Sequence, residues 1–155
     1  MNKLITYINK LNSFKFIILA SLLSYISTIP FTLISFYLNN TNKFNGYTEL
    51  SLIINILIAI FLVPIVESGV ILVIINVVSK FIKNKINIMF ISAIFFSCLH
   101  YYSLIYIFAV FIPSLMLTYS YLIYKPKNVH LKPIAIMTII HSLYNFYNIL
   151  FSNIF

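Results

Sequence analysis

A glutamate lies in the middle of the longest apolar run of this sequence, where only hydrocarbon side chains would be expected. Glu67 stands in the stretch LVPIVESG, residues 62–69, three positions after Pro64. The chain holds only two acidic residues, and Glu49 is the other. An acid at the centre of a bilayer costs about 2.5–3.5 kcal/mol, so such a residue normally faces the interior of a helix bundle and marks a function. We therefore expect Glu67 to belong to a functional site.

Three polar residues in later apolar segments are candidates to share that site with Glu67. They are His100, His141 and Asn145. His141 and Asn145 are four positions apart, so both project from one face of a helix. At 1.5 Å per helical residue, the four candidates lie about 12–20 Å from the lysine-bearing ends of their helices. We therefore expect Glu67, His100, His141 and Asn145 to meet at a similar depth from three helices.

These residue types together suit the hydrolysis of a peptide bond. A glutamate is a suitable general base for a water molecule. Histidine and asparagine N–H groups can donate to the oxyanion of a tetrahedral intermediate, where one donor is typically worth about 10²–10³ in rate. A catalytic zinc site needs three protein ligands and an open fourth position, and Glu67, His100 and His141 could supply those ligands. The sequence leaves a zinc-dependent and a metal-free mechanism open.

The composition predicts an integral membrane protein. Hydrophobic residues make up 62% of the 155 residues and charged residues 8%, whereas soluble domains average roughly 45–50% apolar and about 25% charged residues. The net charge of +8 comes from ten basic residues, all lysines, which stand in short clusters between apolar segments. Such clusters set the membrane topology and contact anionic lipid, so we expect no nucleic-acid partner.

We expect one all-α domain over residues 1–155, a polytopic bundle of about five transmembrane helices with a cytoplasmic N-terminus. The expected spans are residues 14–38, 50–78, 86–100, 104–124 and 133–151. The second is longer than the roughly 20 residues that a bilayer needs, and Pro64 with Gly69 marks the expected kink or break. This topology places every lysine except Lys43 on the cytoplasmic side, in agreement with the positive-inside rule.

Three short motifs carry a resemblance to a known family. They are PIVES at residues 64–68, FSCLH at 96–100 and HSLYN at 141–145. In order and spacing they resemble the CAAX-protease and bacteriocin-processing family of intramembrane proteases, also called the Abi family. Its members show a paired glutamate followed by three residues and an arginine, then Phe-x-x-x-His, then His-x-x-x-Asn. The resemblance covers about residues 60–150.

The resemblance implies an intramembrane endopeptidase in which Glu67 is the base, while His100, His141 and Asn145 position the water and stabilise the oxyanion. It implies a peptide or protein substrate and a lipid environment, and we expect a multi-pass protein of a prokaryotic cell membrane. Two positions depart from the family pattern. Ser68 stands in place of the second glutamate, and Leu72 in place of the arginine.

These departures leave other functions open. The first alternative is a non-catalytic membrane protein of the same family, such as a bacteriocin-immunity or accessory protein. Another is a small proton-coupled transporter or channel component that uses Glu67 and the histidines as a relay. The relay is disfavoured because no helix carries a continuous line of polar residues.

Overall fold

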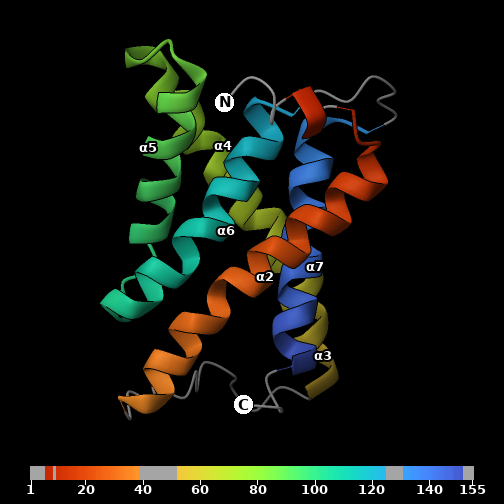
Figure 1. The fold of residues 1–155 in the computed structure, drawn as a ribbon, viewed down its shortest axis with the longest axis vertical. Coiled ribbons are helices and arrows are strands. Elements are labelled where there is room, and N and C mark those ends of the chain that lie inside the picture. The colour runs from red at the N-terminus through yellow and green to blue at the C-terminus, as the bar shows by residue number, and fades with distance from the viewer. Residues whose placement is uncertain (1–5, 9, 39–51, 125–130, 152–155) are drawn as a thin grey trace.

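The structure is a bundle of membrane helices (Figure 1). It is a computed structural model that describes residues 6–8, 10–38, 52–124 and 131–151, and all regular secondary structure in these residues is helical. In chain order the elements are α2 (Ser13–Tyr37), α3 (Leu52–Leu57), the π-helical turn η1 (Ile58–Leu62), α4 (Val63–Phe81), α5 (Lys85–Cys98), α6 (Leu104–Leu122) and α7 (Pro133–Phe151). The predicted polytopic all-α bundle is confirmed.

Four of the five expected spans are long and apolar enough to cross a membrane. These are Ser13–Tyr37, Ile53–Phe81, Leu104–Leu122 and Pro133–Phe151. The remaining span is α5, which has 14 residues and is therefore about 21 Å long. Because the hydrocarbon core is about 30 Å thick, α5 ends inside the depth of the membrane. The turn after α5 is consequently held at the level of the bundle interior.

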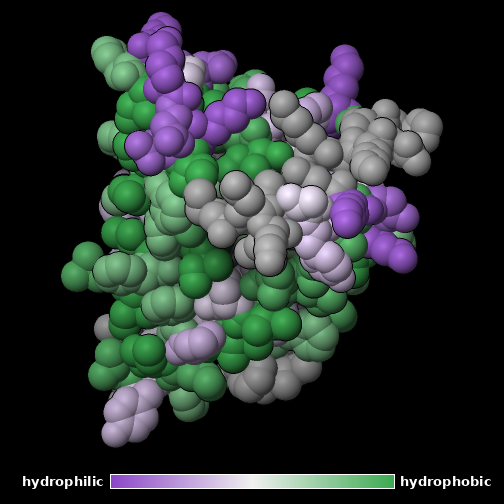
Figure 2. Space-filling view, turned by 45° about the horizontal axis from the view of Figure 1, so that its top comes forward, coloured by the Kyte–Doolittle hydropathy of each residue, from purple (hydrophilic) through white to green (hydrophobic). Residues whose placement is uncertain are grey.

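Most of the outer surface is apolar, as a lipid environment requires. Large hydrophobic side chains such as Phe95 and Phe108 are each 59% exposed. Figure 2 shows a hydrophobic surface with hydrophilic side chains gathered toward one end. Several buried hydroxyl groups bond within their own helices, for example Ser114 to the Val110 carbonyl at 2.7 Å. These bonds satisfy polar groups that lipid cannot.

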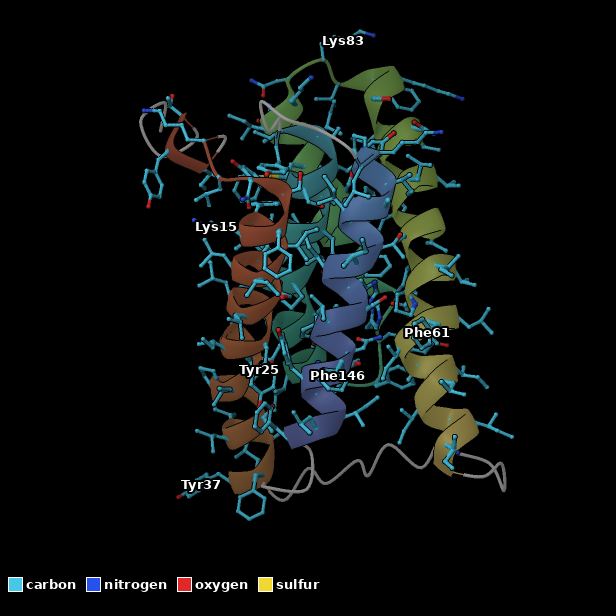
Figure 3. All side chains as sticks on the ribbon, turned by 90° about the vertical axis from the view of Figure 1, so that its right-hand side faces the viewer. Lys15, Tyr25, Tyr37, Phe61, Lys83 and Phe146 are labelled. Carbon is cyan, nitrogen blue, oxygen red and sulfur yellow. The ribbon has the colours of Figure 1, made fainter. Side chains whose placement is uncertain are left out.

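The lysines of the described residues stand near one end of the bundle. Lys15 lies in the first turn of α2, Lys80 in the last turn of α4, Lys85 at the start of α5 and Lys132 just before α7. These helix ends lie together at the top of Figure 1. In Figure 3, Lys15 and Lys83 lie on the side opposite Tyr37. This arrangement agrees with the predicted clustering, while the cytoplasmic orientation stays a prediction.

Two central helices connect the bundle. α6 packs against α2, α5 and α7, and α7 packs against α2, α4, α6 and η1. The core between them contains side chains that are almost completely buried, including Ile71, Ile136, Met137 and Ile140. The middle of α7, where His141 follows Ile140, is therefore enclosed by its neighbours.

The irregular part of the second span lies earlier than predicted. The sequence places a kink between Pro64 and Gly69, but α4 continues through both residues and η1 precedes them. The Val63 N–H donates to the Ile58 carbonyl, five residues back. Proline has no N–H and its ring clashes with the carbonyl four residues before it, so the helix widens on its N-terminal side. Glu67 therefore stands on a regular helix directly after the irregular turn.

Side-chain caps mark the starts of α5 and α6, the two helices that the His100 turn connects. The Asn84 side chain accepts a hydrogen bond from the Ile86 N–H at 2.9 Å at the start of α5. The Ser103 hydroxyl accepts one from the Tyr106 N–H at 3.1 Å at the start of α6. Serine and asparagine are preferred at this position because they satisfy backbone donors that have no partner within the helix. The two caps fix where α5 begins and where the α5–α6 turn ends.

Candidate active site

The carboxylate of Glu67 faces two histidines from other parts of the bundle. Its Oε2 lies 3.2 Å from Nε2 of His141 on α7, and its Oε1 lies 3.9 Å from Nε2 of His100 after α5. The side chains of His141, His100 and Glu67 are 5%, 17% and 29% exposed. The structure therefore brings together three of the four residues that the sequence singles out, in a site that is largely enclosed.

His141 is the more deeply buried partner of Glu67. Its Nδ1 is buried and has no hydrogen-bond partner among the described residues. A buried N–H donor without an acceptor is costly, and a neutral imidazole carries its hydrogen on one nitrogen only. The hydrogen is therefore best placed on Nε2, which then donates to Glu67. This contact holds one carboxylate oxygen and leaves the other for a different partner.

His100 has the opposite arrangement of its two ring nitrogens. Its Nδ1 lies 3.1 Å from the carbonyl oxygen of Phe96. A carbonyl only accepts, so Nδ1 carries the hydrogen and Nε2 presents a lone pair toward Glu67. The 3.9 Å between His100 Nε2 and Glu67 Oε1 is too long for a direct hydrogen bond. A water molecule can bridge polar groups that are too far apart for a direct hydrogen bond, and a water at this place would donate to both.

Asn145 lies one turn further along α7 but has a different partner. Its amide Nδ2 donates to the backbone carbonyl of Ala59, in η1, at 2.9 Å. The structure therefore joins Asn145 to the helix that carries Glu67, through the backbone rather than through the carboxylate. Its proposed contact with an oxyanion stays a prediction.

Aromatic rings surround the two histidines. The Phe96 ring meets the His100 ring edge to face with centroids 5.0 Å apart, and the Tyr106 ring lies 5.8 Å from His100. The Tyr144 ring lies 6.2 Å from His141. Sequence reasoning missed both tyrosines as neighbours of the site. Tyr144 lies three positions after His141, which is a usable signal on a helix, whereas nothing in the sequence indicates that Tyr106 would pack on His100.

The two departures from the family motif change the surroundings of Glu67. Ser68 is 1% exposed, and its hydroxyl has no hydrogen-bond partner among the described residues. Leu72 is half-buried on the same helix. In the described part of the chain, ion-pair distances to Glu67 come from His100 and His141. The two histidines therefore hold the carboxylate in the described part of the chain.

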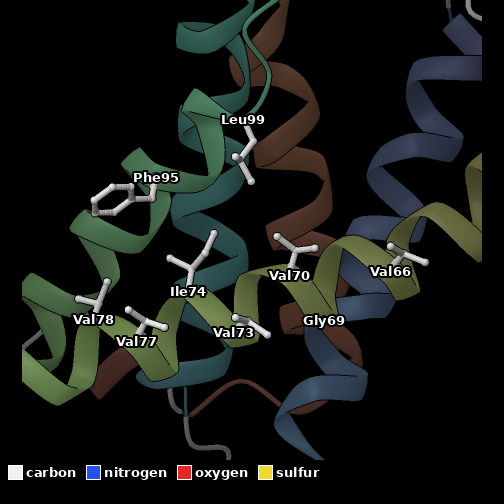
Figure 4. Close-up of a pocket in the computed structure, with 9 residues that line it drawn as sticks. All are labelled: Val66, Gly69, Val70, Val73, Ile74, Val77, Val78, Phe95 and Leu99. Atoms are coloured by element: carbon white, nitrogen blue, oxygen red, sulfur yellow. The ribbon is translucent and has the colours of Figure 1, made fainter.

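An apolar groove of about 640 Å³ runs between α4 and α5 beside the site. It is lined by Val66, Gly69, Val70, Val73, Ile74, Val77, Val78, Phe95 and Leu99. Figure 4 shows the α4 side chains along one wall of the groove and Phe95 and Leu99 on the α5 side. Val66 and Leu99 are the immediate neighbours of Glu67 and His100 in the sequence. Glu67, His100 and His141 do not line the groove, but its lining residues Val66 and Leu99 place one end of it at the level of these residues along α4 and α5.

The zinc-dependent alternative stays a prediction. Within the described residues, no group of three or more His, Cys, Asp and Glu side chains that could hold a metal ion is found. Glu67, His100 and His141 nevertheless lie close together, with 3.2 Å between Glu67 Oε2 and His141 Nε2. The step proposed below uses side chains of the chain itself.

The family resemblance agrees with a comparison against known families. The model of the family described as "Type II CAAX prenyl endopeptidase Rce1-like" matches residues 49–147, more than half of the chain. This range contains Glu67, His100, His141 and Asn145. No match was found among curated proteins or among solved structures. The chain thus belongs to the Rce1-like family of type II CAAX prenyl endopeptidases.

Proposed function

We propose that this protein is an intramembrane endopeptidase in which Glu67 activates a water molecule for attack on a peptide bond. The observation that carries the proposal is the position of the Glu67 carboxylate between the Nε2 atoms of His141 and His100, at 3.2 and 3.9 Å. Three ionisable side chains, from two helices and the α5–α6 turn, meet inside a largely apolar bundle. Such convergence is costly unless the groups act together.

In this mechanism the water lies between Glu67 and His100. It donates one hydrogen to Glu67 Oε1 and the other to the lone pair of His100 Nε2. Glu67 takes the first proton as the oxygen of the water forms a bond to the carbonyl carbon. The carboxyl group then returns this proton to the amide nitrogen as the C–N bond breaks. The second hydrogen of the water stays on its oxygen until the new carboxylic acid passes it to the amine. The products are then a peptide carboxylate and an ammonium group, and Glu67 is ionised again.

His141 holds Glu67 in the orientation that this step needs. Its Nε2–H contacts Oε2, so Oε1 remains directed toward the water. The single N–H of the neutral ring is engaged by the carboxylate, so the role of His141 in this step is to orient the base.

The apolar groove between α4 and α5 supports a lipid-modified peptide as substrate. The family name describes prenyl endopeptidases, and a prenyl chain is a branched hydrocarbon. Among its lining residues, Val66 directly precedes Glu67 in the sequence and Leu99 directly precedes His100. A prenyl chain in this groove would leave the attached peptide at the level of the Glu67 carboxylate.

Cleavage of a synthetic peptide by the purified protein tests the proposal. We expect full-length protein in lipid vesicles to cleave a farnesylated Cys-aliphatic-aliphatic-X peptide faster than the same peptide without the farnesyl group. Glu67→Gln keeps the shape of the side chain and removes the base, so we expect kcat to fall by about 10²–10⁴. Ser68→Ala is the matched control, because the Ser68 hydroxyl has no partner among the described residues. Cleavage by Glu67→Gln at the wild-type rate would refute the proposal.

A second candidate is a non-catalytic immunity or accessory protein of the same family. Ser68 and Leu72 favour it, because the family's second acid and its arginine are missing from the helix that carries Glu67. In that case the polar cluster serves packing alone. Cells that express Glu67→Gln would then be protected from a bacteriocin as well as cells that express the wild type, and no peptide would be cleaved by either protein.

A further inference from the structure

Pro64 leaves one carbonyl of η1 without a donor from its own helix. In a regular α-helix the Ala59 carbonyl would accept from the N–H of residue 63, but the Val63 N–H donates to Ile58 instead. In the π-helical register of η1 the Ala59 carbonyl would accept from residue 64, which is a proline and has no N–H. Neither the α-helical nor the π-helical register therefore gives the Ala59 oxygen a backbone donor.

An unpaired carbonyl is unfavourable at this depth of a membrane. Water is scarce there, so a backbone group that is not bonded within its helix must find a partner on a neighbouring helix. The neighbour of η1 is α7. The Asn145 side chain of α7 donates to the Ala59 oxygen at 2.9 Å. Asn145 thus supplies the hydrogen bond that Pro64 removes.

We propose that Asn145 is a positioning residue whose amide compensates for Pro64 and thereby fixes the helix carrying Glu67 against α7. Two contacts then join the same pair of segments. Asn145 bonds Ala59 before Pro64, and one turn away His141 contacts Glu67 after Pro64. With only one of these contacts, α4 could still rotate about that contact. The catalytic consequence of this proposal rests on the proposed function, but the hydrogen bond itself does not.

A double-mutant cycle with Pro64 tests the contact without any measurement of catalysis. In Pro64→Ala the new N–H at residue 64, or that at residue 63 if η1 becomes α-helical, can donate to Ala59. We expect Asn145→Ala to lower the Tm of the detergent-solubilised protein by about 2–6 °C in the wild-type background. The same change should have almost no effect in the Pro64→Ala background. Asn148→Ala is the matched control, because Asn148 donates to Tyr144 on its own helix at 3.0 Å.

The outcomes of this cycle are decisive in both directions. An equal fall in Tm in the two backgrounds overturns the proposal, because Asn145 would then stabilise something other than the carbonyl that Pro64 exposes. No fall in the wild-type background also overturns it. The measurement remains valid if no variant cleaves any peptide, so failure of the proposed function is distinguishable from failure of this proposal.

Peptide cleavage separates positioning from direct catalysis. If Asn145 acts through Ala59, Asn145→Ala lowers both kcat and Tm in the wild-type background. Adding Pro64→Ala should then restore both quantities to the values of Pro64→Ala alone. If Asn145 instead donates to the oxyanion, the Tm returns and kcat stays about 10²–10³ below that of Pro64→Ala alone. The second result would overturn the positioning role.

Discussion

The two sides of the site are held in different ways. On the α4–α7 side, Glu67 and His141 are 3.2 Å apart, and Asn145 joins the same helices through Ala59. On the other side, His100 lies in a turn after a short helix, 3.9 Å from Glu67. Its neighbours Tyr101 and Tyr102 are 82% and 64% exposed.

This difference indicates that the two sides of the site have different roles. The α4–α7 side fixes the carboxylate by direct contacts between long helices. The α5–α6 turn offers a lone pair at a distance that suits a water molecule, and it adjoins the apolar groove that contains Leu99. We infer that the base is held rigidly and that water and substrate enter from the side of His100. The following predictions test this comparison.

The largest effect is expected from His141→Ala. The change removes the direct partner of Glu67 and leaves a cavity beside the carboxylate, and a hydrogen bond to a charged group is worth about 1.5–3 kcal/mol. We expect a lower Tm and the loss of cleavage together. His141→Gln retains an N–H that can reach Glu67, so it should recover most of the Tm. If His141→Ala melts like the wild type, the α4–α7 side is not the rigid one.

His100→Ala should separate activity from stability. His100 contacts Glu67 only across 3.9 Å, so we expect its removal to lower the Tm much less than His141→Ala does. It should nevertheless lower kcat by about 10²–10³, because the water loses one of its two partners. Melting curves and cleavage rates of the same preparations check this. Equal losses of Tm for the two histidine variants would contradict the different roles of the two sides.

A smaller effect is expected when the groove is filled. Val73→Trp places a large ring in the α4–α5 groove, where Val73 is 62% exposed. We expect KM for the farnesylated peptide to rise about tenfold, the equivalent of about 1.4 kcal/mol, with little change in kcat. Ile139→Trp is the control, since Ile139 lines a separate apolar groove of about 540 Å³ between α4 and α7. A rise in KM for the control alone would place substrate entry on the α7 side.

The smallest effect is expected from removing metal ions. The proposed step uses Glu67 as the base and the two histidines as its hydrogen-bonding partners. We therefore expect kcat to be unchanged after dialysis against a chelator. Loss of cleavage that zinc restores would return Glu67, His100 and His141 to the role of metal ligands.

The sequence by itself determined the class of structure and singled out three residues, Glu67, His100 and His141, that the structure brings together. An acid in an apolar run is so costly that Glu67 stands out without any alignment. The lysine clusters and the proline at the start of α7 predicted its range, Pro133–Phe151, as observed. These features are local, because span length, charge placement and helix starts depend on residues near one another in the chain.

Only the tertiary structure decided how the site is assembled. Depth along each helix suggested that Asn145 would lie with Glu67. In the structure, the Asn145 amide instead donates to the Ala59 carbonyl. The sequence placed the irregularity after Pro64, whereas η1 lies before it. The packing of Tyr106 on His100 left no local signal. The physical reason is that helix rotation and the partners of unpaired backbone groups are set by contacts between distant segments, which no local periodicity encodes.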